Sequence, residues 1–308
     1  MGQVSRKLKK YILGIALGIA LMCGKESYAQ YNREYFFWVG RSCMMNNDYQ
    51  EAIRTLNTLL RFDEDAFEGY FLRGIAKYNL DDLLGAEADF TTAIEKNPVF
   101  TTAFTYRAIT RSRLGNYDDA LQDFREAIDL RPDLPDAYYS RGYTRLQNKQ
   151  YEEAIEDFDK FIFQENKVAD AYIGRGTAYL YLKDTVRALE NFDQAIRTNR
   201  ENPNGYYQRG TLLLQKEEYA RAEADFDMSI RCDSAFLPPY FNRAVVYSNT
   251  NRPMQALADF DRVLQLDSTN SFTYFNRAIL RTQIGDYNRA LDDFDRVALY
   301  LSLIHISE

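Results

Sequence analysis

The sequence predicts an all-α solenoid of about eight helical hairpins, and two recurring patterns predict it. In the first pattern, an arginine followed by a glycine or alanine returns at intervals of 34 residues. Its small residues are Gly74, Ala108, Gly142, Gly176, Gly210, Ala244 and Ala278, and one further interval back is Gly40. In the second pattern, aromatic residues and alanines around these pairs return in the same phase. A period of this length is typical of an array that repeats one supersecondary element.

Each 34-residue repeat contains two stretches of helical periodicity. When the small residue above is taken as position 8, position 4 is aromatic and position 20 is alanine in all eight repeats, and position 24 is phenylalanine in seven. Positions 4, 8 and 11 share one helical face, and positions 20, 24 and 27 share another. A break near position 15, such as LGNY at 114–117, separates the two. The repeats therefore start near residues 33, 67, 101, 135, 169, 203, 237 and 271.

The glycine at position 8 needs a packing reason, because glycine inside a helix costs about 1 kcal/mol relative to alanine. Antiparallel pairing places Gly142 opposite Ala154 and Phe158 of the second helix, where a missing side chain lets the two backbones approach closely. We expect the same role for Gly74, Gly176 and Gly210.

The arginine column at position 7 faces an acidic column at position 23, for example Arg141 and Asp157. A basic ladder that binds an acidic partner is one reading of the arginines. We favour structural Arg–Asp pairs within each repeat, because an unpaired arginine on that face would be costly. The aspartates at position 25 form Asp-Phe-Asp triplets, but side chains two residues apart on a helix diverge. We therefore expect a solvated face there and no cation site.

The repeats resemble tetratricopeptide repeats (TPRs), with an aromatic residue at 4, a small one at 8, alanine at 20 and an aromatic at 24. The resemblance covers residues 33–300 and implies a right-handed superhelix. It also implies a non-enzymatic scaffold or adaptor that binds a protein or peptide in a concave groove. The arginines at position 7 and the charged residues at position 11 depart from the family pattern.

In the resembled family, positions 2, 5, 9, 12 and 13 line the groove. The residues here that the resemblance assigns to partner binding are Phe71, Tyr139, Tyr143, Gln147, Tyr181, Tyr207, Gln215, Phe241, Asn249 and Phe275. Simple packing against neighbouring repeats is the alternative role for the aromatic residues at position 5. The family's clamp for a terminal carboxylate needs lysine at 5 and asparagine at 9, and Phe71 and Ile75 replace them in repeat two.

Net charge and residue composition disfavour nucleic-acid binding and catalysis as functions of this chain. Residues 30–300 carry 33 Lys or Arg and 43 Asp or Glu, a net charge of −10, which disfavours nucleic-acid binding. The single histidine, His305, lies near the C-terminal end, and the sequence has no metal-spaced Cys/His cluster, phosphate loop or nucleophile motif. We expect no catalytic residue, no cofactor and no metal.

Residues 1–29 read as a secretory signal peptide, with basic residues, a short apolar run and small residues before Gln30. An uncleaved anchor and a lipoprotein modified at Cys23 are the alternatives. The signal predicts an exported protein, periplasmic or associated with the cell envelope, that contacts a membrane only through a lipid anchor or a segment outside this sequence.

Residues 301–308, LSLIHISE, resemble the translation of a transposon-end adapter used to prepare sequencing libraries. We interpret them as an artefact, so that the native chain would continue with further repeats or a helix. The array would then be either the scaffold itself or the ligand-receiving portion of a longer sensor or signalling protein. Self-assembly through the open end of the array is a third reading.

Overall fold

The computed structural model describes the backbone of residues 25–307 and the side chains of residues 33–300. Most of the expected signal peptide and the final residue of the adapter-like segment lie outside this range. The described residues form helices and no strand. The chain divides into two compact units, residues 1–148 and 149–308.

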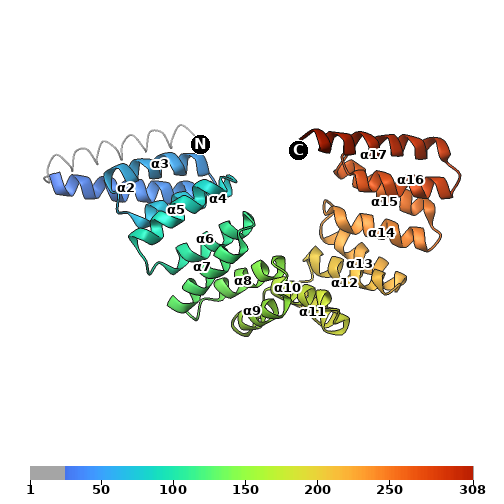
Figure 1. The fold of residues 1–308 in the computed structure, drawn as a ribbon, viewed down its shortest axis with the longest axis horizontal. Helices are drawn as coiled ribbons and strands as arrows, with labels where there is room; N and C mark the ends of the chain where they lie inside the picture. Colours follow the sequence, from blue (N-terminus) through green and yellow to red (C-terminus); the bar gives the residue numbers. More distant parts are fainter. Residues whose placement is uncertain (1–24, 308) are drawn as a thin grey trace. The chain divides into compact units, whose positions relative to one another are not determined.

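The first unit contains α2 (Lys25–Met45), α3 (Tyr49–Phe62), α4 (Phe67–Asn79), α5 (Leu83–Lys96), α6 (Thr101–Arg113), α7 (Tyr117–Leu130) and α8 (Pro135–Gln147). The second contains α9 (Tyr151–Gln164), α10 (Ala169–Tyr181), α11 (Thr185–Thr198), α12 (Pro203–Gln215), α13 (Tyr219–Cys232), α14 (Leu237–Asn249), α15 (Pro253–Leu266), α16 (Ser271–Gln283) and α17 (Tyr287–Ser307). Within each unit, helices consecutive in sequence pack side by side (Figure 1). The predicted all-α solenoid of helical hairpins is confirmed.

The turn inside each hairpin has the same backbone conformation at position 15. The φ angle is positive at all eight of these positions, and only Gly115 and Gly285 are glycines; the others are Asn47, Asp81, Lys149, Lys183, Glu217 and Asn251. In the turn after α12, Glu217 N–H donates to Leu214 O at 2.9 Å and Glu218 N–H donates to Leu213 O at 2.9 Å. This is the Schellman arrangement, which satisfies the free carbonyls at the end of a helix.

The interior of each hairpin is built from the small and aromatic columns. Phe90, Phe124, Phe158, Phe192 and Phe226 at position 24 are each 0% exposed. A Cβ placed on Gly74 would lie 2.7 Å from Phe90 Cε1, and one on Gly210 would lie 2.9 Å from Phe226 Cε1. The missing side chain at position 8 therefore leaves room for the phenylalanine ring of the paired helix.

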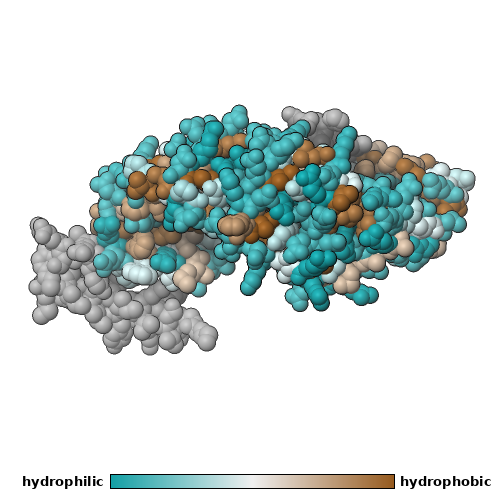
Figure 2. Space-filling model, turned by 90° about the horizontal axis from the view of Figure 1, so that it is seen from below, coloured by the Kyte–Doolittle hydropathy of each residue, from teal (hydrophilic) through white to brown (hydrophobic). Residues whose placement is uncertain are grey.

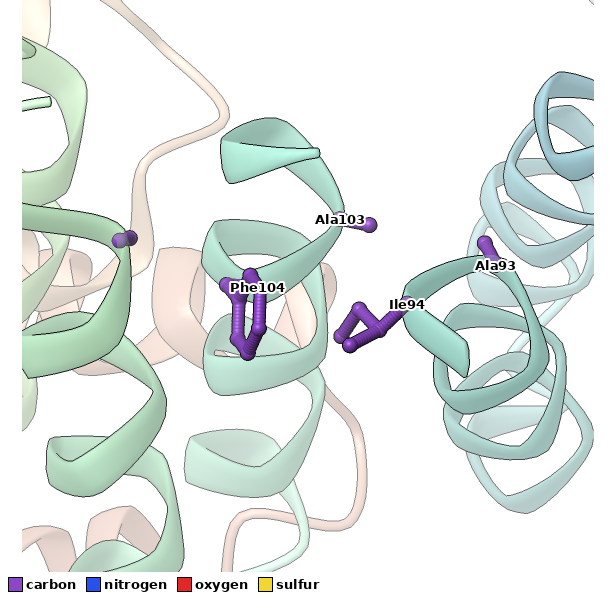
Figure 3. Close-up of a cluster of buried hydrophobic side chains, with 5 residues drawn as sticks. Ala93, Ile94, Ala103 and Phe104 are labelled. Carbon is purple, nitrogen blue, oxygen red and sulfur yellow. The ribbon is translucent and has the colours of Figure 1, made fainter. Parts of the chain in front are cut away.

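Neighbouring hairpins share smaller apolar clusters. Ile94 of α5 points into the space between α5 and α6, toward Phe104 (Figure 3). Ala93, Ala103 and Ala127 belong to the same cluster and are each fully buried. Small residues at these contacts let consecutive helices approach closely, so the core is a series of clusters, several of which join two hairpins.

Two features concern the ends of the described range. The backbone of residues 301–307 continues α17 as one helix. Among the described residues, no helix is both long enough and apolar enough to cross a membrane.

Candidate partner-binding groove

Arginine–aspartate pairs fix the first helix in five of the hairpins, and in repeat five Arg175 Nε donates to Asn191 Oδ1 at 2.8 Å instead. Arg73 donates from Nε to Asp89 Oδ2 at 2.8 Å and from Nη2 to Oδ1 at 2.6 Å. The same two-bond contact joins Arg107 to Asp123, Arg209 to Asp225, Arg243 to Asp259 and Arg277 to Asp293. Such bidentate geometry is the strongest form of a charge-assisted hydrogen bond and orients both helices.

The third arginine nitrogen, Nη1, reaches the preceding hairpin. It donates from Arg209 to Asp193 at 2.6 Å, from Arg243 to Asp227 at 2.5 Å and from Arg277 to Asp261 at 2.5 Å. These acceptors are the position-25 aspartates, for which we had expected a solvated face. The side chains of Asp193, Asp227 and Asp261 are 42%, 38% and 51% exposed, as a solvated face requires, but each also pairs with the arginine of the next hairpin, which the sequence did not predict.

The charged residues at position 11 also belong to this network. Lys77 lies 2.8 Å from Asp89, Arg111 lies 2.9 Å from Asp123, and Arg281 lies 2.7 Å from Asp293. In repeats two and three the Nη1 partner of the position-7 arginine is neutral, Asn57 or Thr91. In these two repeats, the buried aspartate at position 23 thus has two cationic partners, from positions 7 and 11, and the position-7 arginine has a neutral partner in the preceding hairpin.

The residues predicted to form the core of repeat four lie in different units. Gly142 and Arg141 are buried on α8 of the first unit. Ala154, Asp157 and Phe158 are each 0% exposed on α9 of the second unit. Their burial fits the proposed roles, and the contacts of Gly142 with Ala154 and of Arg141 with Asp157 stay predictions.

A groove lies between α6 and α8 of the first unit and consists of two adjoining cavities. One of about 210 Å³ is lined by Ile109, Ser112, Arg113, Tyr139, Ser140, Tyr143, Thr144 and Gln147. The other, of about 290 Å³, is lined by Thr102, Thr105, Tyr106, Ile109, Arg131, Leu134, Asp136, Tyr139 and Ser140. We call their combined lining the α6–α8 groove. It brings together three predicted binding residues, Tyr139, Tyr143 and Gln147.

The groove is open because position 5 of repeat three is Thr105 and not an aromatic residue. In repeat two the equivalent Phe71 ring packs 4.9 Å from Phe100 and 5.4 Å from Tyr106, measured between ring centroids. The residues equivalent to Phe100 and Tyr106 are Leu134 and Ser140, and both line the larger cavity. Thr105 is itself 4% exposed and its hydroxyl donates to Thr101 O at 3.3 Å. The space that a ring fills in repeat two is thus left empty.

Hydroxyl groups and aromatic rings give the smaller cavity its chemistry. Thr144 Oγ1 lies 3.1 Å from Ser112 Oγ, and Ser112 Oγ donates to Gln147 Oε1 at 3.2 Å. The rings of Tyr139 and Tyr143 meet edge to face at 5.0 Å. Such a surface offers apolar contact together with neutral hydrogen-bond donors and acceptors.

Charged side chains stand at the rim of the groove. Arg113 Nη2 bonds to Asp81 at 2.7 Å, and its guanidinium lies 4.8 Å from the centroid of the Tyr78 ring. Tyr78, and then Asp81, raise the pKa of Arg113 above its ordinary value. Arg131 and Asp136 are exposed beside the larger cavity. Arg113 is therefore a fixed cation, whereas Arg131 is available to a partner.

The remaining predicted groove residues have other surroundings. Phe71 packs within the first unit, and Tyr207 and Phe241 lie 5.4 Å from Phe236 and 5.2 Å from Phe272 in the second. These three rings pack against neighbouring elements and are partly exposed, and their role in partner binding stays a prediction. Residues with larger exposure are Tyr181, which stacks on Tyr151 at 4.8 Å, and Phe275, Gln215 and Asn249. On the face drawn in Figure 2, apolar side chains form separate patches among hydrophilic ones.

Sequence reasoning missed the small residues of the groove. Thr105, Ser112, Ser140 and Thr144 define its floor, and two of them occupy positions that the family pattern does not assign to binding. The only signal was the absence of an aromatic residue at position 5 of repeat three. Within the described part of the chain, no group of three or more His, Cys, Asp or Glu residues is arranged to hold a metal ion.

Two segments match family models of tetratricopeptide repeats, residues 113–149 and residues 173–235. Residues 241–298 match the model described as anaphase-promoting complex subunit 5. None of the curated proteins matches the sequence.

Solved structures share the fold. A tetratricopeptide repeat protein from Parabacteroides merdae has a TM-score of 0.65 and 19% identity, covering 84% of this chain and 99% of its own. The C-terminal part of a TPR repeat-containing protein from Cytophaga hutchinsonii has a TM-score of 0.57 and 22% identity, covering 77% and 97%. Yeast Tom70 has a TM-score of 0.64 and 19% identity, covering 92% of this chain and 60% of its own.

Repeats of this type generally mediate protein–protein interactions, and their fold is generally a non-catalytic scaffold. The 34-residue period, the helical hairpins and the two model matches agree with one another. The chain thus contains segments that match tetratricopeptide-repeat models, at residues 113–149 and 173–235, and it has the fold of tetratricopeptide repeat proteins.

Proposed function

We propose that this chain is a non-enzymatic scaffold that holds a segment of a protein partner in the α6–α8 groove. The observation that carries the proposal is the empty space beside Thr105, bordered by Leu134, Tyr139 and Ser140. A single large side chain of a partner fits a cavity of about 290 Å³. The adjoining cavity extends the site along α8, as an extended peptide requires.

The chemistry of the lining favours a mainly uncharged segment. Tyr139 and Tyr143 present rings, and Ser112, Thr144 and Gln147 present neutral polar groups that can bond to a peptide backbone. Arg131 at the rim favours an acidic residue in the flank of the segment. This environment does not support nucleic-acid binding, since the expected mature chain is acidic.

The setting of this scaffold follows from the N-terminal sequence. We propose that the chain is exported and acts in the periplasm or at the cell envelope. In the alternative, the same groove is the ligand-receiving part of a longer sensor or signalling protein. Both versions need the groove, so its binding activity is the first property to test.

The variant Thr105→Phe tests the groove by filling it, and the contact it removes is the hydrogen bond from the Thr105 hydroxyl to Thr101 O. It places at position 5 of repeat three the ring that Phe71 supplies in repeat two, and the ring would fill the larger cavity. Random peptides displayed on phage are selected on the unaltered chain, and the enriched sequences are synthesised and titrated by fluorescence anisotropy. We expect their binding to weaken at least about tenfold on Thr105→Phe, because an anchoring side chain loses its pocket.

Phe163→Ala is the matched control, because Phe163 is a 91% exposed aromatic residue of the second unit that is not among the predicted groove residues. It should leave the same peptides bound with unchanged affinity. Thermal unfolding of Thr105→Phe verifies that the variant is folded. Equal affinity for the unaltered chain and for Thr105→Phe would refute the groove as the binding site.

A further inference from the structure

Another cavity of the first unit, of about 320 Å³, lies between α2 and α4. Its lining combines apolar and charged residues, namely Arg33, Glu34, Phe37, Leu59, Ala66 and Glu68. We call this cavity the α2–α4 pocket. It shares no lining residue with the α6–α8 groove, so the function proposed above does not involve it.

The pocket is open because position 34 of repeat one is Ala66. The equivalent residue of repeat two is Phe100, whose ring lies 4.9 Å from that of Phe71 at position 5, measured between ring centroids. Repeat one also has a ring at position 5, Phe37, but Ala66 places only a methyl group beside it. Ala66 and Leu59 are 3% and 1% exposed. These two residues and Phe37 therefore give the pocket an apolar floor.

Two glutamates give the pocket a negative charge. Glu34 of α2 is exposed and Glu68 of α4 is partly exposed, and neither has a hydrogen-bond or ion-pair partner within the described part of the chain. The cation of the lining, Arg33, lies 2.8 Å from Asp63 Oδ2, so its charge is already compensated. The two carboxylates are thus the charges of the lining that lack a counter-ion.

Helix stability accounts for only one of these glutamates. Glu68 lies in the first turn of α4, where a carboxylate interacts favourably with the helix dipole. Glu34 lies inside α2, which runs from Lys25 to Met45, and has no such role. A second reason is therefore needed for an unpaired carboxylate at this position, and the apolar floor beside it suggests a ligand that is both apolar and cationic.

We propose that the α2–α4 pocket binds a lysine or arginine side chain of a protein partner. The apolar floor contacts the alkyl stem, and Glu34 and Glu68 pair with the charged end. Long basic side chains suit such a site, because their methylene groups pack on apolar surface while the charged end needs a counter-ion. The pocket is thus a second binding site, which selects a basic residue, whereas the α6–α8 groove favours a mainly uncharged segment.

An NMR titration of the full chain, labelled with ¹³C at the leucine methyl groups, tests the proposal. The reporter is Leu59, which lines the pocket. The probe is the peptide acetyl-Gly-Gly-Lys-Gly-Gly-amide, and its control has norleucine in place of lysine, which keeps the alkyl stem and removes the charge. We expect the lysine peptide to shift the Leu59 signals with a dissociation constant of about 1 mM or lower. The norleucine peptide should bind at least about fivefold more weakly, because it leaves both glutamates unpaired.

Three substitutions in the chain separate the charges from the space. Glu34→Gln and Glu68→Gln should each weaken binding of the lysine peptide about threefold and reduce its salt dependence. Glu95→Gln is the matched control, since Glu95 is an exposed glutamate of the same unit outside the pocket, and it should leave the affinity unchanged. Ala66→Phe should abolish binding, because it supplies the ring that Phe100 supplies in repeat two, and thermal unfolding verifies that this variant is folded.

Equal affinity for the lysine and norleucine peptides would overturn the proposal, as would unchanged affinity in the double variant Glu34→Gln with Glu68→Gln. No shift of the Leu59 signals up to about 10 mM lysine peptide would also overturn it. If cadaverine shifted these signals and the lysine peptide did not, the site would belong to a free amine. Thr105→Phe fills the α6–α8 groove and should leave the lysine peptide bound, so the two sites are tested independently. Loss of the lysine peptide in Thr105→Phe would overturn its assignment to the α2–α4 pocket.

Discussion

Arg209 binds Asp225 through two hydrogen bonds, from Nε at 2.8 Å and from Nη2 at 2.6 Å. Its remaining nitrogen, Nη1, binds Asp193 of the preceding hairpin at 2.6 Å. The hydrogen bond to Asp225 raises the pKa of Arg209 above its ordinary value. One guanidinium thus joins the two helices of its own hairpin and also joins that hairpin to its neighbour.

Removing the buried acceptor should be much more damaging than removing the exposed one. Asp225→Ala removes a carboxylate that is 8% exposed and leaves Nε and Nη2 of Arg209, a side chain 24% exposed, without a partner. We expect the free energy of unfolding to fall by about 2–4 kcal/mol. Asp193 is 42% exposed, so Asp193→Ala should cost less than about 1 kcal/mol. Urea denaturation of both variants measures the difference, and equal losses would contradict this division of roles.

The network also shows what the sequence could and could not predict. The sequence predicts the pairing of positions 7 and 23 because both positions belong to the same hairpin. The small residues between its two helices define how these helices lie against each other. The argument that Asp225 and Asp227 diverge on α13 was correct. It did not predict that Asp227, although 38% exposed, also accepts a hydrogen bond from Arg243 Nη1 of the next hairpin at 2.5 Å.

The groove was predictable only in part for a similar reason. Tyr139, Tyr143 and Gln147 follow from the family pattern, but the cavities depend on Thr105 and Ser140 of consecutive repeats. A cavity is the volume that neighbouring side chains leave unfilled, so the residue type at a single repeat position does not predict it. Phe71, Tyr207 and Phe241 share a column with Tyr139, yet their neighbours use them for packing.

The contact of Gly176 with Phe192 sets a size limit at position 8. A Cβ on Gly176 would lie 2.7 Å from Phe192 Cε1, which is closer than packed carbons approach. Ala108 and Ala244 occupy the same position in other repeats and are 0% exposed, so the ring can shift enough for one methyl group. We expect Gly176→Ala to change the free energy of unfolding by less than about 1 kcal/mol.

Gly176→Leu should exceed that limit and cost about 3 kcal/mol or more, because the added branches have no space beside Phe192. Thermal and urea unfolding of the two variants test the limit together. A leucine variant as stable as the alanine variant would show that the helices are not held at close approach.

The turn residue Glu217 carries a backbone strain that glycine would relieve. Its φ of 59° lies in the left-handed region, which disfavours side chains with a Cβ. We expect Glu217→Gly to raise the free energy of unfolding by up to about 1 kcal/mol, less the entropy that glycine adds to the unfolded chain.

Asn251→Gly is the control, since Asn251 has a φ of 57° but asparagine tolerates this conformation better. We expect urea denaturation to show a smaller increase in the free energy of unfolding for Asn251→Gly than for Glu217→Gly. A loss of stability in Glu217→Gly would mean that side-chain interactions of Glu217 outweigh the strain.

The ion pair of Glu223 with Arg252 should make stability depend on acidic pH. Arg252 donates to the two carboxylate oxygens at 3.0 and 2.6 Å, and these hydrogen bonds lower the pKa of Glu223 below its ordinary value of 4.5. A carboxyl group with a lowered folded-state pKa stabilises the fold fully above its ordinary pKa and loses that contribution as pH falls through the folded-state value. Because the side chain is partly exposed and salt-screened, the contribution is at most about 1 kcal/mol. Glu223→Gln should therefore lose stability at pH 7 and approach the unaltered chain in stability as the pH falls below 4.5 and through the lowered folded-state pKa of Glu223. Glu190→Gln, an exposed control, should parallel the unaltered chain throughout. Unfolding free energies measured by urea denaturation across this range test the pair, and a Glu223→Gln deficit that stays constant down to the lowest pH would assign the effect to packing and not to charge.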